Sequence, residues 1–144
     1  MSQPPGFVDD YLAYLLARAS HLISSEFHAV VEASGLSLME WRVMASLSGK
    51  DSLSVGELAD IVLAKQPTVT KLVGRMEEAG WVKRWDAPHD RRQSLVSLTP
   101  AGQGKVKPLL VQARAHEGQV MADIGLAEVA QLKKVLERMI AVRG

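Results

Sequence analysis

Apolar residues recur at steps of three and four along the first part of the chain, between about residues 7 and 33. That spacing places them on one face of an amphipathic helix. Gly35 follows the last of them and is typical of the C-terminal end of a helix. The pattern therefore predicts one long helix, whose apolar face contains Leu12, Leu15, Leu16, Ala19, Leu22, Ile23, Phe27, Val30 and Val31.

Three shorter helices are predicted next, and the first two share one local signal. Ser37 with Glu40, and Ser54 with Glu57, have the spacing of capping boxes, in which the two side chains satisfy free backbone N–H groups at a helix start. The predicted helices cover about residues 37–48, 54–61 and 65–79, and the last has an apolar face of Val69, Leu72, Val73 and Met76.

The pattern then becomes extended. Residues 81–85 and 93–98 are predicted strands, and the turn-rich segment 86–92 joins them into a β-hairpin. Thr99 and Pro100 are typical of a helix start, an N-cap hydroxyl followed by proline at the first helical position. The last two predicted helices cover residues 100–124 and, after Gly125, residues 126–142.

This order of elements predicts a mainly α fold with a small β-hairpin wing. A short helix, a tight turn and a second helix, followed directly by a two-stranded hairpin, form a winged helix-turn-helix. The long amphipathic helices at both ends carry more apolar surface than one small centre can cover. We therefore expect them to form a helical dimerisation region. The expected division is 1–36 and 99–144 for this region and 37–98 for the winged helix-turn-helix lobe.

The composition sets limits on the class of protein. The chain has 144 residues, enough for one domain with a substantial core. It has no cysteine, which excludes disulfides, thiol switches and Cys-ligated zinc. No apolar run reaches the roughly 18–20 residues of a membrane span, and the first residues lack the features of a signal peptide. We therefore expect a soluble, cytoplasmic protein that does not bind a membrane.

The charge is unevenly distributed. The net charge of +1 does not by itself indicate a nucleic-acid partner. Residues 1–53, however, carry three basic and six acidic groups, whereas residues 65–92 carry seven basic and four acidic groups. The small total therefore hides a basic central segment that can face an anionic partner.

Four segments carry a family resemblance, namely Leu53–Ala59, Gln66–Arg84, Asp86–Arg92 and Leu98–Gly102. Together with the long flanking helices, they make the chain similar to the MarR family of bacterial transcription regulators over nearly its whole length. The resemblance implies a triangular homodimer whose outer helices form the interface and whose two lobes bind a double-stranded, pseudo-palindromic DNA operator. It also implies a ligand-responsive regulator, most often a repressor, that a small molecule releases from DNA.

The helix predicted over residues 65–79 has a polar face with hydroxyl groups and cations near its N-terminal half. Such a face suits insertion into the major groove, where its side chains reach base edges and phosphates. The alternative is an ordinary solvated face whose cations pair with Glu78. The hairpin that follows and the resemblance favour DNA contact, and the residues expected to make it are Gln66, Thr68, Thr70, Lys71 and Arg75.

The tip of the wing is the second predicted DNA contact. Its sequence Asp90-Arg91-Arg92 matches the Asp-x-Arg pattern of the family, which implies that Arg92 enters the minor groove and that Asp90 holds it in position. A narrow minor groove concentrates negative potential and suits arginine better than strongly hydrated lysine. Arg91 and either Lys83 or Arg84 are candidates for phosphate contacts. The alternative is an ordinary charged hairpin tip.

A polar stripe on the first helix is a candidate wall of a small-molecule effector pocket, with residues of the second helix opposite. Cationic groups beside aromatic rings suit an aromatic carboxylate. The alternative is a solvated or subunit-facing polar edge. The residues expected to line this pocket are Tyr14, Arg18, His21, Trp41 and Arg42.

No metal site, cofactor or enzymatic activity is expected. His21 and His28 lie two helical turns apart, too far for a local chelate. The sequence contains no Gly-rich phosphate loop and no nucleophile elbow. The competing function is a winged-helix protein-interaction module without specific DNA binding.

Overall fold

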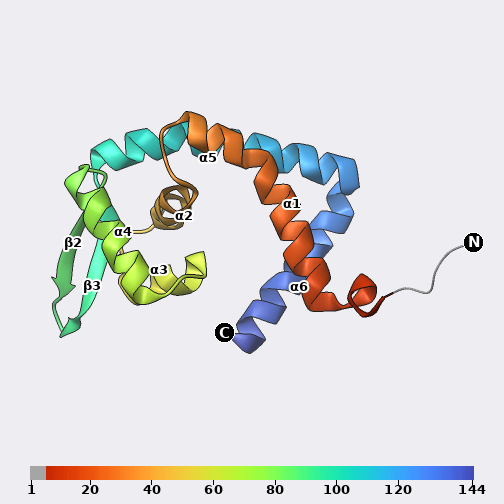
Figure 1. The fold of residues 1–144 in the computed structure, drawn as a ribbon, viewed down its shortest axis with the longest axis horizontal. Helices are drawn as coiled ribbons and strands as arrows, with labels where there is room; N and C mark the ends of the chain where they lie inside the picture. Colours follow the sequence, from red (N-terminus) through yellow and green to blue (C-terminus); the bar gives the residue numbers. More distant parts are fainter. Residues whose placement is uncertain (1–5) are drawn as a thin grey trace, which may run out of the picture. The chain divides into compact units, whose positions relative to one another are not determined.

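The computed structural model describes residues 6–144 and contains a winged helix-turn-helix (Figure 1). The predicted fold class, mainly helical with a small β wing, is confirmed. None of the described helices is long and apolar enough to span a membrane. The elements are the 3-10 helix η1 (Phe7–Asp10), α1 (Leu12–Ala33), α2 (Leu38–Leu47), β1 (Leu53–Ser54), α3 (Val55–Val62), α4 (Gln66–Glu78), β2 (Val82–Ala87), β3 (Asp90–Leu98), α5 (Pro100–Ile124) and α6 (Leu126–Arg143).

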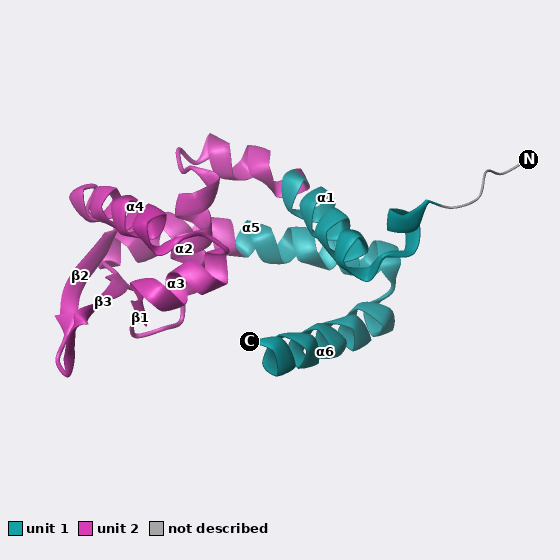
Figure 2. Cartoon of the chain, turned by 60° about the horizontal axis from the view of Figure 1, so that its bottom comes forward, with its two compact units in different colours: residues 1–25, 111–144 teal, residues 26–110 magenta. Residues whose placement is uncertain are grey.

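The chain divides into two compact units (Figure 2). One combines the residues up to 25 with residues 111–144, and the other comprises residues 26–110. Helices α1 and α5 each continue across a boundary between the units. The division predicted at residues 36 and 98 concerns function rather than compactness, and it stays a prediction.

The unit of residues 26–110 has a continuous apolar core. All four residues of the predicted apolar face of α4 are buried, and α4 packs against α3 and β2. Both predicted capping boxes are present: Ser37 pairs with Glu40 and Ser54 with Glu57. The same core contains Val43, Met44, Leu47, Leu58, Val82, Val96 and Val106.

The wing is a three-stranded antiparallel sheet with the strand order β1-β3-β2. The predicted loop over residues 86–92 is wrong, because the turn contains only Pro88 and His89 and both strands extend beyond the predicted ends. Cross-strand hydrogen bonds, which polar residues form as well as apolar ones, sustain that extension. Strand β1 was not predicted, because two residues are too few to show alternation.

The first helix begins later than predicted. Residues 7–10 form a separate 3-10 turn, and Tyr11 is extended, with φ −78° and ψ 118°. The Asp9 carboxylate accepts a hydrogen bond from the Gly6 N–H at 2.7 Å, and the rings of Phe7 and Tyr11 pack with centroids 4.8 Å apart. Short acidic side chains compete in this way with helical hydrogen bonding.

A small set of backbone contacts joins the end of α4, the start of the wing and the start of α5. Thr99 N–H donates to the Trp81 carbonyl at 3.0 Å, and Thr99 Oγ1 donates to the Gly80 carbonyl at 2.6 Å. The same hydroxyl accepts from Gly102 N–H at 3.0 Å. A Cβ on Gly102 would overlap the Trp81 carbonyl oxygen and lie 2.9 Å from its carbon. Only glycine permits this approach.

The unit that contains α6 has little core of its own. Among residues 6–25 and 111–144, Val129 is the one buried apolar side chain. Large apolar side chains are exposed along all of its helices, including Leu12, Leu15, Leu22, Ile23, Val111, Ile124, Leu126, Leu132, Ile140 and Val142.

Within that unit, charged side chains link α5 to α6. The Glu117 carboxylate accepts hydrogen bonds from Lys133 Nζ at 3.0 Å and from Arg114 Nη1 at 2.9 Å. The hydrogen bond from Lys133 is the largest effect on the pKa of Glu117 and lowers it. Burial, the next largest, raises the pKa, and the hydrogen bond from Arg114 and both positive charges add to the net lowering.

We expect the substitution Gly102→Ala to lower the free energy of unfolding by about 2–3 kcal/mol, because the added methyl group displaces either α5 or Trp81. The matched control is Gly104→Ala in the same helix, where a Cβ has no atom within 4 Å. That control should gain roughly 0.5–1 kcal/mol from helix propensity. Urea unfolding measures both, and a Gly102→Ala protein as stable as the parent would contradict the account.

We expect Lys133→Met to destabilise the protein by ~0.5 kcal/mol at neutral pH, a small value because the ion pair is partly exposed. A lowered folded-state pKa means that the Glu117 carboxylate stabilises the protein above its ordinary pKa of 4.5 and loses this effect as the pH falls through the folded-state value. The difference from the parent should therefore shrink below pH 4.5. Lys134→Met is the control. A stability difference between the Lys133→Met and parent proteins that grows in acid would contradict a lowered pKa of Glu117.

Candidate nucleic-acid interface

Helix α4 exposes a polar surface along most of its length. Pro67 lies in the first turn, where the missing N–H costs no hydrogen bond. Gly74 is half-buried, and a Cβ built there meets no atom within 4 Å, so packing within the chain does not require glycine. The five predicted contact residues of this helix, Gln66, Thr68, Thr70, Lys71 and Arg75, are all exposed.

The cations of α4 are not neutralised by neighbours. Neither Lys71 nor Arg75 forms an ion pair with any other described residue. The alternative in which Glu78 pairs with them is therefore absent from the structure. Their charges are available to an external anion such as a phosphate.

The turn between α3 and α4 depends on one unusual residue. Leu63 adopts the left-handed conformation, with φ 59° and ψ 45°, and Ala64 N–H donates to the Ala59 carbonyl at 3.0 Å. Leu63 is 91% exposed, so packing of its side chain does not explain its presence. A left-handed leucine costs about 1 kcal/mol, and the turn carries this strain to set the direction of α4.

At the wing, the predicted Asp90–Arg92 contact is present. Asp90 Oδ1 accepts a hydrogen bond from the Arg92 N–H at 3.0 Å and lies 3.7 Å from Arg92 Nε. The Arg92 side chain is 96% exposed, so its guanidinium projects from the wing while the aspartate restrains its base. Arg91 is also exposed.

Three of the predicted contact residues lie together. Gln66 and Thr70 of α4 and Arg92 of β3 line one hollow of about 300 Å³, whose other walls include Ser54 and Gly56. A Cβ on Gly56 would lie 3.3 Å from Gln66 Nε2, so the Gln66 amide rests against the first turn of α3.

Ser54 and Gly56 were not predicted as part of this surface. A usable signal was present, because the Ser54 capping box marks a helix N-terminus, and the free N–H groups there attract phosphate. Gln93 and Ser94, which also line the hollow, gave no sequence signal.

The two alternatives for a phosphate contact in β2 differ in their surroundings. Arg84 Nη2 lies 3.5 Å from Glu77 Oε1, and its backbone N–H donates to Glu77 Oε2 at 3.2 Å. Lys83 lies on the opposite face of the strand, with Nζ 5.6 Å from the centroid of the exposed Trp85 ring. Trp81 is half-buried beneath Lys105, whose Nζ lies 5.7 Å from its ring and donates to the Ser34 carbonyl.

The predicted effector residues fall in both units. Tyr14, Arg18 and His21 are exposed on α1 in the unit that contains α6, whereas Trp41 and Arg42 belong to residues 26–110. The Trp41 ring packs against Phe27, with centroids 5.5 Å apart. The pocket that would combine the five residues stays a prediction. Within residues 6–144, no three His, Asp or Glu side chains are placed to hold a metal ion.

Comparisons with known proteins agree with this architecture. The model of the MarR family matches residues 34–93, which include α2 to α4 and most of the wing. The transcriptional activatory protein BadR of Rhodopseudomonas palustris is 32% identical over 89% of this chain and 78% of its own length. The homoprotocatechuate degradative operon repressor of Escherichia coli is 29% identical over 92% of this chain and 90% of its own length.

A solved structure extends the likeness to the whole fold. The crystal structure of the MarR family transcriptional regulator SPO1453 from Silicibacter pomeroyi has a TM-score of 0.85 and 34% identity, and the match covers 97% of this chain and all of that one. The likeness therefore includes the long flanking helices as well as the winged helix-turn-helix. This chain belongs to the MarR family of transcription regulators.

Proposed function

We propose that this regulator is a sequence-specific repressor that binds a pseudo-palindromic operator as a homodimer and is released by a small-molecule effector. One observation carries the DNA-binding part. Gln66 and Thr70 of α4 and Arg92 of the wing line one hollow, beside cations of α4 that lack ion-pair partners among the described residues. A phosphate backbone supplies the missing negative charge.

The two elements suit different grooves. The N-terminal half of α4 offers the Gln66 amide, the Thr68 and Thr70 hydroxyls and the Lys71 ammonium group, and Arg75 follows in the last turn. Such groups read base edges in the major groove. Arg92 stands on the outer part of the wing, where only β2 and β3 pair. This narrow projection suits the negative potential of an adjoining minor groove. Asp90 favours a minor-groove contact by Arg92, because it restrains the backbone of Arg92 and leaves the guanidinium exposed.

The exposed apolar surface supports the proposal that two copies of the chain form a dimer. The unit of residues up to 25 and 111–144 buries Val129 alone among its described apolar side chains. Such a surface is unfavourable in water and typical of a protein–protein interface. Two lobes held by one interface would read half-sites about one helical turn apart.

An aromatic carboxylate is the proposed effector, received by Tyr14, Arg18, His21, Trp41 and Arg42. The names of relatives support this class. One 29% identical relative is the repressor of a homoprotocatechuate degradative operon, and NadR, a protein of the same fold, has been solved in complex with 4-hydroxyphenylacetate. Repression is favoured by several relatives named as repressors, whereas BadR is named an activatory protein.

A mobility-shift titration tests the function as a whole. The probes are the DNA upstream of the gene itself and a library of genomic fragments, each measured at several salt concentrations. We expect one or a few fragments to bind at least about 10³-fold more tightly than bulk DNA. Uniform weak binding, or none, would contradict the proposal and favour the protein-interaction module.

We expect Arg92→Ala to weaken binding to the selected fragment by roughly 1–3 kcal/mol and to leave the oligomeric state unchanged. Arg143→Ala, which removes an exposed arginine at the end of α6, is the matched control and should bind like the parent. Fluorescence anisotropy at physiological salt measures both. Equal affinity of the Arg92→Ala and parent proteins would exclude the minor-groove contact.

Sedimentation equilibrium should find a dimer at micromolar concentration. We expect Ile140→Glu to shift it toward monomer, because Ile140 is 70% exposed on α6 and a buried unpaired charge opposes association. Ile61→Glu changes an exposed isoleucine of α3 in the other unit and should leave the dimer intact. A parent protein that sediments as a stable monomer would overturn the dimer.

A further inference from the structure

Lys105 joins three parts of the unit of residues 26–110 that are distant in the sequence. It belongs to the second turn of α5, and its Nζ donates a hydrogen bond at 2.6 Å to the carbonyl of Ser34, just after the end of α1. The same Nζ lies 5.7 Å from the centroid of the Trp81 ring, at the base of the wing. The side chain of Lys105 is half-buried, so its role lies within the fold.

The end of α1 receives its positive charge from Lys105. The last carbonyl groups of a helix lack intrahelical donors and carry partial negative charge. The last turn of α1 contains no basic residue, and Glu32 adds a further negative charge there. Gly35 turns the chain with a φ of +86°, and a Cβ on it would lie 3.9 Å from Lys105 Nζ. The ammonium group therefore rests directly against the turn that ends α1.

The Trp81 ring is the second partner of this ammonium group. The face of an indole ring attracts a cation more strongly than any other aromatic side chain does. Lys105 forms no ion pair with any residue that the structure describes. Because a half-buried charge is costly without partners, the carbonyl of Ser34 and the ring of Trp81 are held together through Lys105.

The backbone of Trp81 joins α4 to the wing. Its N–H donates to the Met76 carbonyl at 3.0 Å, and its carbonyl accepts from the Thr99 N–H at 3.0 Å. The close approach of Gly102 to the same carbonyl leaves this segment little room to shift along α5. The contact with Lys105 adds a restraint on the ring, and it ties the base of the wing to the end of α1.

A restraint at the base of the wing has a large effect at its tip. Strand β2 follows directly after Trp81 and has six residues, a length of about 20 Å at roughly 3.3 Å per residue. A tilt of about 5° over that length displaces the tip by roughly 2 Å, whereas hydrogen bonds require N···O distances of about 2.7–3.2 Å. The position of Arg92 is therefore sensitive to how firmly the base is held.

We propose that Lys105 is a positioning residue for DNA binding, which holds the base of the wing against the end of α1 and so fixes the place of Arg92 without touching DNA itself. This inference rests on the proposed DNA binding. Loss of the Lys105 contacts weakens binding only through the wing. The loss therefore does not exceed that caused by Arg92→Ala.

A double-mutant cycle on the DNA fragment selected by binding tests this route. Lys105→Met should weaken binding about fivefold in the parent but less than about twofold in the Arg92→Ala protein, because the wing contact is already lost there. Lys105→Gln removes the charge with a polar side chain and should give the same pattern. Fluorescence anisotropy at physiological salt measures each affinity, at a temperature where circular dichroism shows the variants to be folded.

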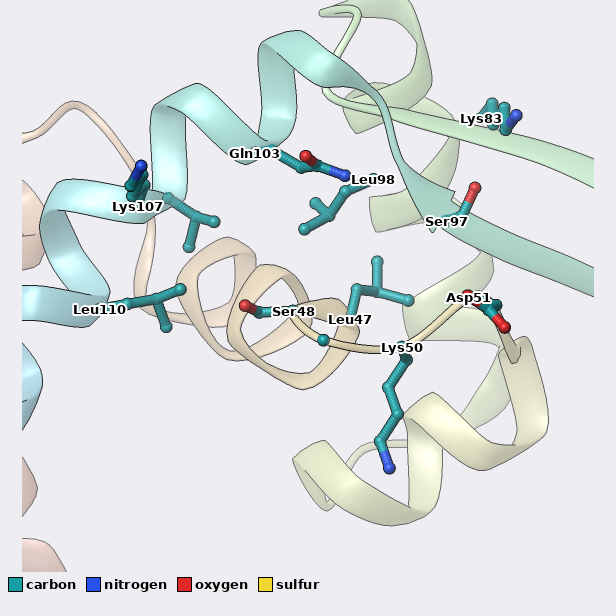
Figure 3. A pocket seen from close by; sticks show the side chains of 12 residues that line it. Leu47, Ser48, Lys50, Asp51, Lys83, Ser97, Leu98, Gln103, Lys107 and Leu110 are labelled. Carbon is teal, nitrogen blue, oxygen red and sulfur yellow. The ribbon is translucent and has the colours of Figure 1, made fainter.

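Lys107→Met is the matched control, because it removes the same charge two residues further along α5. Successive helical residues are about 100° apart, so Lys107 lies on nearly the opposite side of the helix from Lys105. It lines a separate hollow of about 670 Å³ together with Leu47 and Leu98 (Figure 3). We expect Lys107→Met to bind DNA like the parent. A loss as large as that of Lys105→Met would show a general effect of net charge and overturn the proposal.

A measurement without DNA separates this inference from the proposed function. In NMR spectra of the isotope-labelled chain, Lys105→Met should shift the indole N–H signal of Trp81 and leave that of Trp41 in place. An unmoved Trp81 signal, equal affinity of the Lys105→Met and parent proteins, or an equal loss in the Arg92→Ala background would overturn the role of Lys105 and leave the proposed function intact. A parent protein that binds no fragment specifically would overturn both.

Discussion

The approach of Gly102 to the Trp81 carbonyl is the constraint on which the surface formed by α4 and the wing depends. Helix α4 ends at Glu78, and Gly80, with a φ of +84°, turns the chain. Trp81 then leads into the wing, with its N–H donated to the Met76 carbonyl. Thr99 then binds the carbonyls of both residues. These contacts are made by backbone groups and by the short Thr99 hydroxyl, so the angle between α4 and the wing does not depend on long, flexible side chains. That angle brings Arg92 to the same hollow as Gln66 and Thr70.

The two units differ in how they satisfy the hydrophobic effect. Residues 26–110 bury their apolar residues within one chain, whereas the described residues of the other unit leave theirs exposed. The first can therefore hold a precise surface by itself, whereas the exposed apolar side chains of the second support the proposed dimer. The net charge of +1 is compatible with this arrangement, because acidic residues predominate before position 54 and basic ones in residues 65–92.

Local sequence signals predicted most of the elements, because each depends on neighbouring residues. The capping boxes of Ser37 and Ser54 and the apolar face of α4 formed as expected. The failures involve longer-range effects. Strand β1 exists only through its pairing with β3, and the wing strands extend because they pair with each other. The left-handed conformation of Leu63 was not predictable either, because the usual signal for it, a glycine, is absent at this position.

The sequence predicted which residues belong to the candidate site, but it did not predict how they are arranged in space. The spacing of α4 identified its polar face, and the family resemblance of the Asp-x-Arg pattern predicted the contact between Asp90 and Arg92. Neither showed that Gln66 rests on Gly56, nor that Ser54 lines the same hollow, because these contacts join segments brought together only by folding. The larger hollow beside α5 has the same origin, with walls from residues 47 to 110 that no local pattern connects.

Directed cleavage of DNA tests the placement of the wing most directly. The chain has no cysteine, so His89→Cys at the wing turn allows an iron–EDTA group to be attached at one known position. On the fragment selected by binding, we predict two symmetry-related clusters of strand cleavage that flank the protected region, each with the 3′ offset of attack from the minor groove. Cleavage no different from that of a conjugate at Arg143→Cys would contradict a wing that lies in the minor groove.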